Sequence, residues 1–268
     1  MEGAIYGSVS PADYVGLAGW WRATDGITFS TGNRVSQWND ISGNNRHFTA
    51  MNSSYAPITT YGNLVQTANG LGILGGDGNG LLGVLNDYAF KAMLYDGRKM
   101  GITIIYRLSA LNGAGFNFLR TSGNDYVAAN AGYFNIGVPA NTAQTSRTVN
   151  GATTISNSDI VNAYPSAVFP QSHIFSVIDY GYDSASANLH RKSVLDNVVR
   201  TERKFSSAPT SVFTNTPIGV QFGGSTNPAT VYEIILFDHT GKTISQIDFE
   251  YQTLYTNYIL PRYPNLFT

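Results

Sequence analysis

Residues able to bind a sugar are concentrated near the start of the sequence. All three tryptophans, Trp20, Trp21 and Trp38, lie in two neighbouring stretches that read WWRATDG (20–26) and RVSQWNDISGNN (34–45). An indole ring can stack on a sugar face, and the amides and carboxylates beside it can bond sugar hydroxyls. The same residue types also fill protein cores and form turns, so residue type alone leaves both interpretations open.

A glycine-rich segment further along the chain has the composition of a calcium loop. Asp77 and Asn79 lie within GGDGNG (75–80), where glycines let the backbone bend and both side chains offer oxygen ligands. The four histidines are scattered and lack the spacing of a zinc site. We therefore expect Asp77 and Asn79 to be the ligands if a metal is bound, with Ca²⁺ as the sole candidate cofactor. A glycine-rich turn without metal is the favoured interpretation.

A second group of aromatic and amide residues is expected on loops or strand ends. Asn124 and Tyr126 stand close together, and Tyr133 follows within NAGYFN (130–135). If exposed, these side chains would combine ring stacking with hydrogen bonds to hydroxyls, as glycan binding requires. Core aromatics beside turn amides would give the same sequence, so glycan binding by these three residues is a hypothesis.

Five basic residues are expected on one hairpin: Arg191, Lys192, Arg200, Arg203 and Lys204. Few aromatic residues are interleaved with them, which favours a solvated hairpin face or a contact between subunits. Binding of an acidic surface glycan is the alternative.

The overall composition excludes several classes of partner. The 268 residues include 16 Lys and Arg against 17 Asp and Glu, so the formal net charge is -1 and we expect no nucleic-acid partner. The absence of cysteine excludes disulfides and thiolate metal sites, and it favours assembly in a reducing compartment. We recognise no signal peptide, and no apolar run approaches the ~20 residues of a membrane helix. Membrane insertion is therefore not expected.

Periodicity predicts a mostly β protein with one helix at its end. Runs of β-branched and aromatic residues between turn residues predict strands over 101–108, 173–180, 189–195, 198–205, 218–222 and 230–238. Apolar residues at three- and four-residue spacing predict a helix over 243–260, with Thr243 and Gln246 as a capping box and Pro261 as its end. This pattern indicates an all-β, two-sheet antiparallel sandwich with one C-terminal helix. We expect one domain over 15–268, preceded by an N-terminal arm, 1–14, that anchors it to neighbouring subunits.

Three sequence blocks, taken in order, resemble the concanavalin A-like lectin/glucanase superfamily in its laminin-G-like branch, which is common in bacterial surface and phage proteins. The first runs from Leu17-x-x-Trp20 through Asp25-Gly26 to RVSQWNDISGN (34–44), and the second covers 69–80 and the strand from Ile102. The third covers 173–180, 215–224, TVYEIILFD (230–238) and the capped helix. The resemblance covers most of the chain and implies a jelly-roll sandwich of two antiparallel sheets.

The resemblance does not extend to catalytic residues. Retaining glucanases of this superfamily carry two glutamates and an aspartate on one strand, which aims them into the cleft. The glutamates of this chain are Glu2, Glu202, Glu233 and Glu250. Glu250 falls in the predicted helix, and we expect Glu233 at a solvent edge or paired with a cation. Because these glutamates do not form the catalytic set, we expect no enzyme.

The resemblance also bears on the metal. Relatives often hold Ca²⁺ on loops, but many carry adjacent acids where Asn79 and Gly80 stand here.

The resemblance also assigns roles to the tryptophans. It implies that Trp20 and Trp38 fill the core and that Asp40 caps backbone amides in the turn 40–43. Alternation along a strand then places Trp21 on the face opposite Trp20, where we expect it to contact a ligand or a neighbouring subunit. On this interpretation Trp38→Ala unfolds the domain, whereas Trp21→Ala leaves it folded.

The leading hypothesis is a non-catalytic virion structural protein: a phage head decoration, fibre or tail-associated component, assembled in the host cytoplasm and located in the virion. Its partners would be other virion proteins and copies of itself, as a trimer, together with a host cell-surface glycan. The alternative is a calcium-dependent carbohydrate-binding lectin module at the bacterial cell surface. A glycoside hydrolase ranks third, because facing carboxylates are not indicated.

Overall fold

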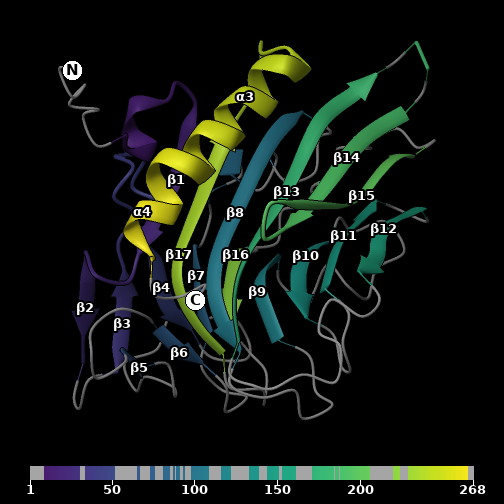
Figure 1. Ribbon diagram of the computed structural model, residues 1–268. Helices are drawn as coiled ribbons and strands as arrows, with labels where there is room; N and C mark the ends of the chain where they lie inside the picture. Colours follow the sequence, from purple (N-terminus) through teal and green to yellow (C-terminus); the bar gives the residue numbers. More distant parts are fainter. Residues whose placement is uncertain are drawn as a thin grey trace, which may run out of the picture.

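Two antiparallel sheets and one C-terminal helical rod are the main parts of the computed structural model (Figure 1). The residues it describes are 9–30, 34–51, 65–66, 73–75, 81–84, 87, 89–90, 93, 98–108, 116–121, 133–138, 144–150, 153–160, 171–183, 185–186, 188–205, 220–223 and 229–264. Within these residues the all-β sandwich with a single C-terminal helix is confirmed.

Sheet A carries the helical rod. Its strand order is β15-β14-β13-β8-β17-β6-β5, and β1 pairs with β17 as well. The strand bounds are β1 (Leu17–Arg22), β5 (Val65–Gln66), β6 (Ile73–Gly75), β8 (Lys99–Leu108), β13 (Gln171–Asp183), β14 (Asn188–Leu195), β15 (Val198–Phe205) and β17 (Ala229–Asp238). The predicted hairpin turn is confirmed, since Asp196 and Asn197 both have positive φ angles of 51° and 61° between β14 and β15.

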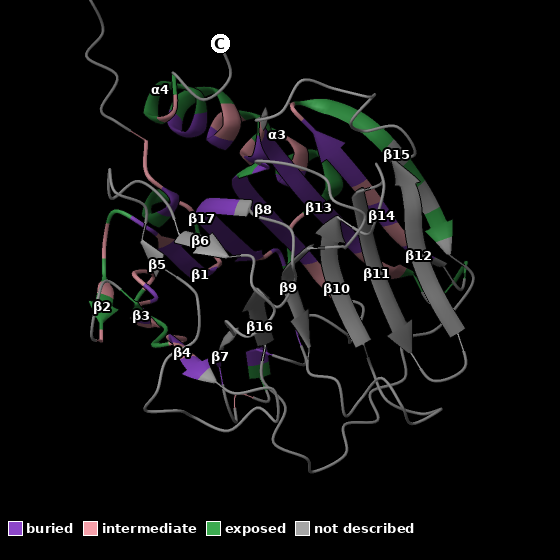
Figure 2. Ribbon diagram, turned by 90° about the horizontal axis from the view of Figure 1, so that it is seen from below, coloured by how far each residue is buried: buried purple, intermediate pink, exposed green. Residues whose placement is uncertain are grey.

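Sheet B lies behind sheet A, with strand order β12-β11-β10-β9-β16-β7-β4-β3-β2. Its strands are β2 (Ile27–Phe29), β3 (Val35–Trp38), β4 (Phe48–Met51), β7 (Leu81–Val84), β9 (Phe116–Thr121), β10 (Tyr133–Val138), β11 (Gln144–Asn150), β12 (Thr153–Ile160) and β16 (Val220–Gly223). Figure 2 shows the three layers in order: the helical rod, sheet A and sheet B.

The helical rod consists of α3 (Ile244–Leu254), a π-helical segment η3 (Tyr255–Ile259) and α4 (Leu260–Arg262). The predicted capping box is confirmed: the Gln246 amide donates to Thr243 Oγ1 at 3.2 Å, and the Thr243 amide donates to Gln246 Oε1 at 2.8 Å. The rod continues to Arg262, one residue beyond Pro261, because α4 holds that proline in its first turn, where no amide is needed. The rod crosses the outer face of sheet A over β17 and β8 (Figure 1).

Strand β17 is apolar on both faces because both faces of sheet A are covered. Ile234 and Leu236 belong to the core between the sheets, whereas Ile235 and Phe237 belong to the core beneath the rod. Side chains of alternating orientation are therefore buried together along the central strands.

The same double coverage corrects the prediction for Trp21. Trp20 and Trp21 do face opposite sides of β1, but Trp21 points between the sheets and is 0% exposed, while Trp20 is buried beneath the rod. The prediction that Trp21 contacts a ligand or a neighbouring subunit is wrong, because its indole is enclosed by the core. Trp38 lies in the core between the sheets, as predicted.

The turn after Trp38 forms as predicted around the Asp40 carboxylate. Oδ1 accepts the backbone amides of Trp20 and Ser42, each at 2.9 Å, and Oδ2 accepts the Arg46 amide at 3.1 Å. A buried carboxylate with three amide donors fixes the 40–46 loop against the middle of β1.

Candidate functional site

An open hollow of about 440 Å³ lies where the segment before β1, the end of β1 and the end of the helical rod meet. We call it the arginine groove. Its lining combines two guanidinium groups with hydroxyl, amide and apolar surfaces: Val9, Ser10, Arg22, Asn257, Tyr258, Pro261 and Arg262. The groove therefore offers several hydrogen-bond donors on a surface that solvent reaches.

A buried carboxylate behind the groove joins these elements. Glu233 is paired with Arg22 across β17 and β1, and an irregularity between Val231 and Glu233 shifts the strand register. Because Val231 and Ile234 both face the core between the sheets, this bulge leaves Tyr232 and Glu233 on the side of the rod. Glu233 thus lies beneath the rod.

Three donors converge on Glu233, which is 0% exposed. Oε1 accepts the indole N–H of Trp20 and the hydroxyl of Tyr258, the latter at 2.6 Å, and Oε2 accepts the Tyr263 hydroxyl at 2.6 Å. Burial raises the pKa of Glu233, while these donors and Arg262 act in the opposite direction. The predicted solvent edge is wrong for this residue; the cation nearby is Arg262, whose Nε lies 3.9 Å from Oε2.

Both groove arginines are held in place by neighbouring groups. Arg22 donates through Nε to Asp25 and through Nη1 to the Tyr258 hydroxyl at 3.3 Å, and its Cζ lies 4.9 Å from the Trp20 ring centre. Arg262 donates through Nη2 to Thr24 Oγ1 at 3.2 Å. Its Cζ lies 5.9 Å from the ring centres of both Tyr258 and Tyr263. Stacking and hydrogen bonding together limit the orientations of each guanidinium group.

The two arginines differ in how their charge is balanced. Arg22 is paired with Asp25; partial burial raises the pKa of Asp25, but hydrogen bonds from Arg22 and Thr24 outweigh this and keep the pKa below its ordinary value. Arg262 approaches a carboxylate only at 3.9 Å. Within the described residues, Arg22 Nη2 and Arg262 Nη1 have no hydrogen-bond partner. Both nitrogens can donate to an incoming oxyanion, and Arg262 carries the less compensated charge.

A hydrolytic mechanism would need two carboxyl groups that face each other across the site. The described residues that line the groove include no Asp or Glu. This lining supports the binding of an anionic group by the two guanidinium groups. Ser10 and Asn257 can form hydrogen bonds with hydroxyl groups of the same ligand.

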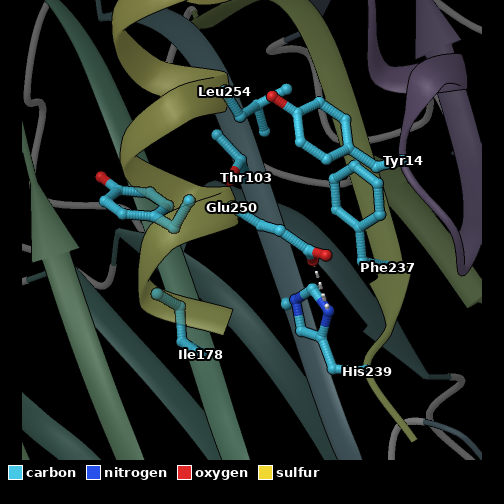
Figure 3. Close-up of a pocket in the computed structure, with 9 residues that line it drawn as sticks. Tyr14, Thr103, Ile178, Phe237, His239, Glu250 and Leu254 are labelled. Carbon is cyan, nitrogen blue, oxygen red and sulfur yellow. Dashed lines mark ion pairs between the residues drawn. The ribbon is translucent and has the colours of Figure 1, made fainter. Parts of the chain in front are cut away.

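A second, smaller cavity of about 20 Å³ lies beneath α3, with room for about one water molecule. Figure 3 shows Tyr14 and Phe237 on one side of it, and His239 facing Glu250 of α3. Burial, with a smaller effect of Lys242, lowers the pKa of His239 to about 4, so the imidazole is neutral at pH 7. Its Nδ1 lies 3.6 Å from Glu250 Oε2, but because the ring is neutral the two groups do not form an ion pair. The ion pair of Glu250 is with Lys242, whose Nζ lies 2.6 Å from Oε2.

Because of His239, we expect the folded protein to lose stability in mild acid. Its pKa is about 4 in the folded protein and near 6.5 when unfolded, so the unfolded state binds the proton more readily as pH falls. The contribution is fully present above pH 6.5, and about 2 kcal/mol of it is lost by pH 5. Urea unfolding at pH 7 and pH 5 should show a smaller decrease for His239→Gln than for the unmodified chain. Equal decreases would contradict the assignment to His239.

The residues predicted from sequence as ligand contacts lie mostly outside the described residues. This holds for Asp77, Asn79, Asn124 and Tyr126. Tyr133 begins β10, opposite Val149 of β11. Their roles in glycan or Ca²⁺ binding stay predictions. Among the residues that the structure describes, no group of three or more His, Asp or Glu side chains could hold a metal ion, and no helix is long and apolar enough to cross a membrane.

The expected basic hairpin is divided by the alternation of β14. Arg191 is fully buried and bonded to Asp179, and Lys192 donates to Asp248 of α3, so the prediction of a solvated face is wrong for both. Arg200 and Lys204 of β15 are exposed, as predicted.

Sequence reasoning missed the arginine groove. Arg22 lies inside the tryptophan-rich stretch, but Asn257, Tyr258 and Arg262 are more than 230 positions away in the sequence. The one available signal was the pair Asn257 and Arg262 at the end of the amphipathic terminal helix, and it does not identify a partner surface.

Comparison with known proteins shows a shared fold. No protein-family model and no curated protein sequence matches the chain. The binding domain of botulinum neurotoxin serotype D/C VPI 5993 superposes with a TM-score of 0.56 at 13% identity, over 91% of this chain and 53% of that chain. The binding domain of botulinum neurotoxin DC in complex with SialylT gives 0.54 at 15% identity, over 87% and 52%.

A third structure belongs to work on botulinum neurotoxin type C, whose cell entry depends on interaction with two ganglioside molecules. It gives a TM-score of 0.51 at 16% identity, over 87% of this chain and 52% of that chain. The chain thus spans about half the length of these neighbours. At these identities the likeness concerns architecture: this chain has the β-sandwich fold found in neurotoxin receptor-binding domains.

Proposed function

We propose that this chain is a non-catalytic adhesion domain that binds an acidic carbohydrate in the arginine groove. The observation that carries the proposal is the pair Arg22 and Arg262, each held by neighbouring groups and each with a donor nitrogen to spare on the rim of an open groove. A sugar carboxylate or sulfate matches the planar fork of a guanidinium, which binds such groups through two parallel hydrogen bonds.

The rest of the groove suits the remainder of a sugar. The Asn257 amide and the Ser10 hydroxyl both donate and accept hydrogen bonds, as sugar hydroxyls require, and Val9 and Pro261 provide apolar contact. The fold neighbours include a neurotoxin binding domain in complex with SialylT and a neurotoxin dependent on gangliosides. These neighbours support sugar-binding adhesion as a use of this fold, while the groove itself is inferred from the residues that line it.

The test is an affinity series against sialylated, sulfated and neutral oligosaccharides by calorimetry. Arg262→Gln should weaken binding of the acidic sugars by about tenfold or more, since a hydrogen bond to a charged group contributes about 1.5–3 kcal/mol. Arg262→Lys should restore part of the affinity, because it returns the charge without the fork.

A matched control removes the same charge elsewhere. Arg200 is exposed on β15, at the edge of sheet A opposite to β1, so Arg200→Gln should leave the affinity unchanged. A loss of affinity in Arg200→Gln equal to that in Arg262→Gln would assign the ligand to the basic hairpin. Absence of binding by the unmodified chain to every acidic sugar tested would refute the proposed function.

The setting of this adhesion domain is a second part of the proposal. We propose that it belongs to a virion, as a head decoration, fibre or tail-associated component that assembles with copies of itself as a trimer. The resemblance to laminin-G-like domains of the concanavalin A-like superfamily, the absence of cysteine and the absence of catalytic carboxylate spacing support this assignment. Light scattering that shows a monomer, together with no association with particles, would contradict it.

The alternative setting is a calcium-dependent lectin module at the bacterial cell surface. It differs in one measurable respect, since Asp77 and Asn79 would then hold Ca²⁺ on their glycine-rich loop. Glycan binding that disappears with a chelator and returns with added Ca²⁺ would favour the lectin module. Binding that is insensitive to the chelator would favour the virion component.

A further inference from the structure

The segment Val9–Tyr14 contributes to both hollows described above. Val9 and Ser10 at its start form part of the wall of the arginine groove, and Tyr14 at its end lines the cavity beneath α3. One short stretch of chain therefore connects the proposed binding site with a cavity on the other side of the N-terminal turn.

Local hydrogen bonds make this segment a unit. Pro11–Asp13 form a 3-10 turn, η1, in which the Asp13 carboxylate accepts the Ser10 amide at 2.7 Å and Ser10 Oγ accepts the Ala12 amide at 3.2 Å. The Asp13 amide donates to Ser10 O at 2.9 Å, and the Tyr14 amide donates to Pro11 O at 3.3 Å. Such a reciprocal cap holds the turn in one conformation, so the placement of Ser10 follows the placement of Tyr14.

Side-chain packing holds this unit to the body of the domain. Within the described residues, every hydrogen bond of Ser10–Tyr14 is internal to the segment. The Tyr14 ring packs edge-on against Phe237 with ring centres 6.0 Å apart and reaches toward Leu254 (Figure 3), and Pro11 is buried as well. The next fixed point is Gly16, whose carbonyl accepts the Asp238 amide at 2.7 Å.

Gly16 shows where the chain joins the sheet. Its φ is +91°, and a Cβ at this position would lie 2.1 Å from the Asp238 carbonyl oxygen, so only glycine fits. Val15, between this point and Tyr14, is 83% exposed, although its carbonyl accepts Lys242 Nζ at 2.6 Å. Tyr14, whose ring packs on Phe237, and the buried Pro11 are thus the side chains that pack between the joint at Gly16 and the groove wall.

The Tyr14 hydroxyl adds no visible bond to this contact. Its oxygen is buried and, among the described residues, has no hydrogen-bond partner. The attraction in this contact therefore comes from the apolar ring.

From these contacts we infer that Tyr14 is a positioning residue of the arginine groove: its ring, inserted beneath α3, holds Val9 and Ser10 in place as one wall. The effect on ligand affinity rests on the proposed function, whereas the docking of the wall can be measured without any ligand. The two measurements below separate these parts.

Docking is tested with spin labels, which the absence of cysteine makes straightforward. Ala12→Cys and Thr256→Cys, both at exposed positions, allow the distance between the segment and the rod to be measured by electron double resonance. The distance distribution should be narrow in the labelled parent and in Tyr14→Phe, and several-fold broader in Tyr14→Ala. An unchanged distribution in Tyr14→Ala would overturn the inference, whatever the glycan data show.

Affinity is tested with the same acidic sugars and with Val15→Ala as the neighbouring control. Tyr14→Ala should weaken binding about three- to tenfold, while Tyr14→Phe and Val15→Ala should bind like the unmodified chain. A broader distribution in Tyr14→Ala with unchanged affinity would overturn the positioning role while leaving sugar binding intact. If the unmodified chain binds no acidic sugar, the proposed function fails and the distance measurement alone decides whether Tyr14 holds the wall.

Discussion

Trp21→Ala is expected to lower the free energy of unfolding by about 3–5 kcal/mol, the cost of removing a large aromatic side chain from a packed core. Domains of this kind have a total stability of about 5–15 kcal/mol, so the variant should be close to unfolding or unfolded at 37 °C. This expectation reverses the sequence-based one, in which Trp21→Ala leaves the domain folded.

The contacts of the indole explain the size of the effect. Its ring centre lies 4.4 Å from that of Phe48 in sheet B and 5.9 Å from that of Phe90, so it bridges the two sheets. Its N–H donates to the Arg46 carbonyl at 2.8 Å. Gly19 leaves the space that the ring occupies, since a Cβ there would lie 2.3 Å from the indole. Truncation therefore removes packing and leaves the Arg46 carbonyl without its indole donor.

Urea unfolding followed by circular dichroism provides the measurement. Trp38→Ala removes a tryptophan from the same core and should cost a similar amount, whereas Val15→Ala, at an exposed position, should cost less than about 0.5 kcal/mol. Trp21→Phe should lose less than Trp21→Ala, because it keeps part of the ring contact. A Trp21→Ala variant as stable as Val15→Ala would show that the indole is not enclosed by the core.

Trp21 also shows how far sequence reasoning extends. Alternation along β1 was predicted correctly, because it follows from the geometry of a strand. The capping box at Thr243 and the turn around Asp40 were predicted correctly for a similar reason, since both are local and depend on side chains a few residues apart. Periodicity could not reveal that the helical rod covers the outer face of sheet A. Because of this cover, both faces of β1 are buried.

The candidate site was beyond the sequence for a different reason. The irregularity at Tyr232 turns Glu233 toward the rod, and a bulge has no signature in a run such as TVYEIILFD. Arg22 and Arg262 meet because β1 pairs with β17 and the rod folds back over both strands. Such a meeting depends on tertiary packing between residues 240 positions apart, which a single sequence does not encode in any local pattern.

The buried ion pair in sheet A carries the second large effect. Asp179→Ala is expected to destabilise the domain by about 3–5 kcal/mol, because it leaves the guanidinium of Arg191 buried without its carboxylate. Arg191 donates through Nε to Oδ1 at 2.5 Å and through Nη2 to Oδ2 at 2.7 Å, a geometry with two parallel bonds. The residues are direct partners across β13 and β14, and both side chains are buried.

The strand pattern places this pair between the two sheets. Phe175 and Val177 alternate with Ile178, and the first two belong to the core between the sheets while Ile178 lies beneath the rod. Asp179 lies on the same face of β13 as Phe175 and Val177, and its cross-strand partner Arg191 lies on that face too. The charges therefore lie away from solvent, where an unpaired ion is far more costly than on the surface.

A double-mutant cycle distinguishes the pair from its separate members. Arg191→Met should cost about as much as Asp179→Ala, since each single change leaves one buried charge unpaired. The combination of Arg191→Met with Asp179→Ala removes both charges and should recover several kcal/mol relative to the sum of the single changes. Simple additivity would mean that each ion is stabilised by other neighbours. The Arg200→Gln control, at an exposed position of the adjacent strand, should change stability by less than about 0.5 kcal/mol, because solvent screens a surface charge.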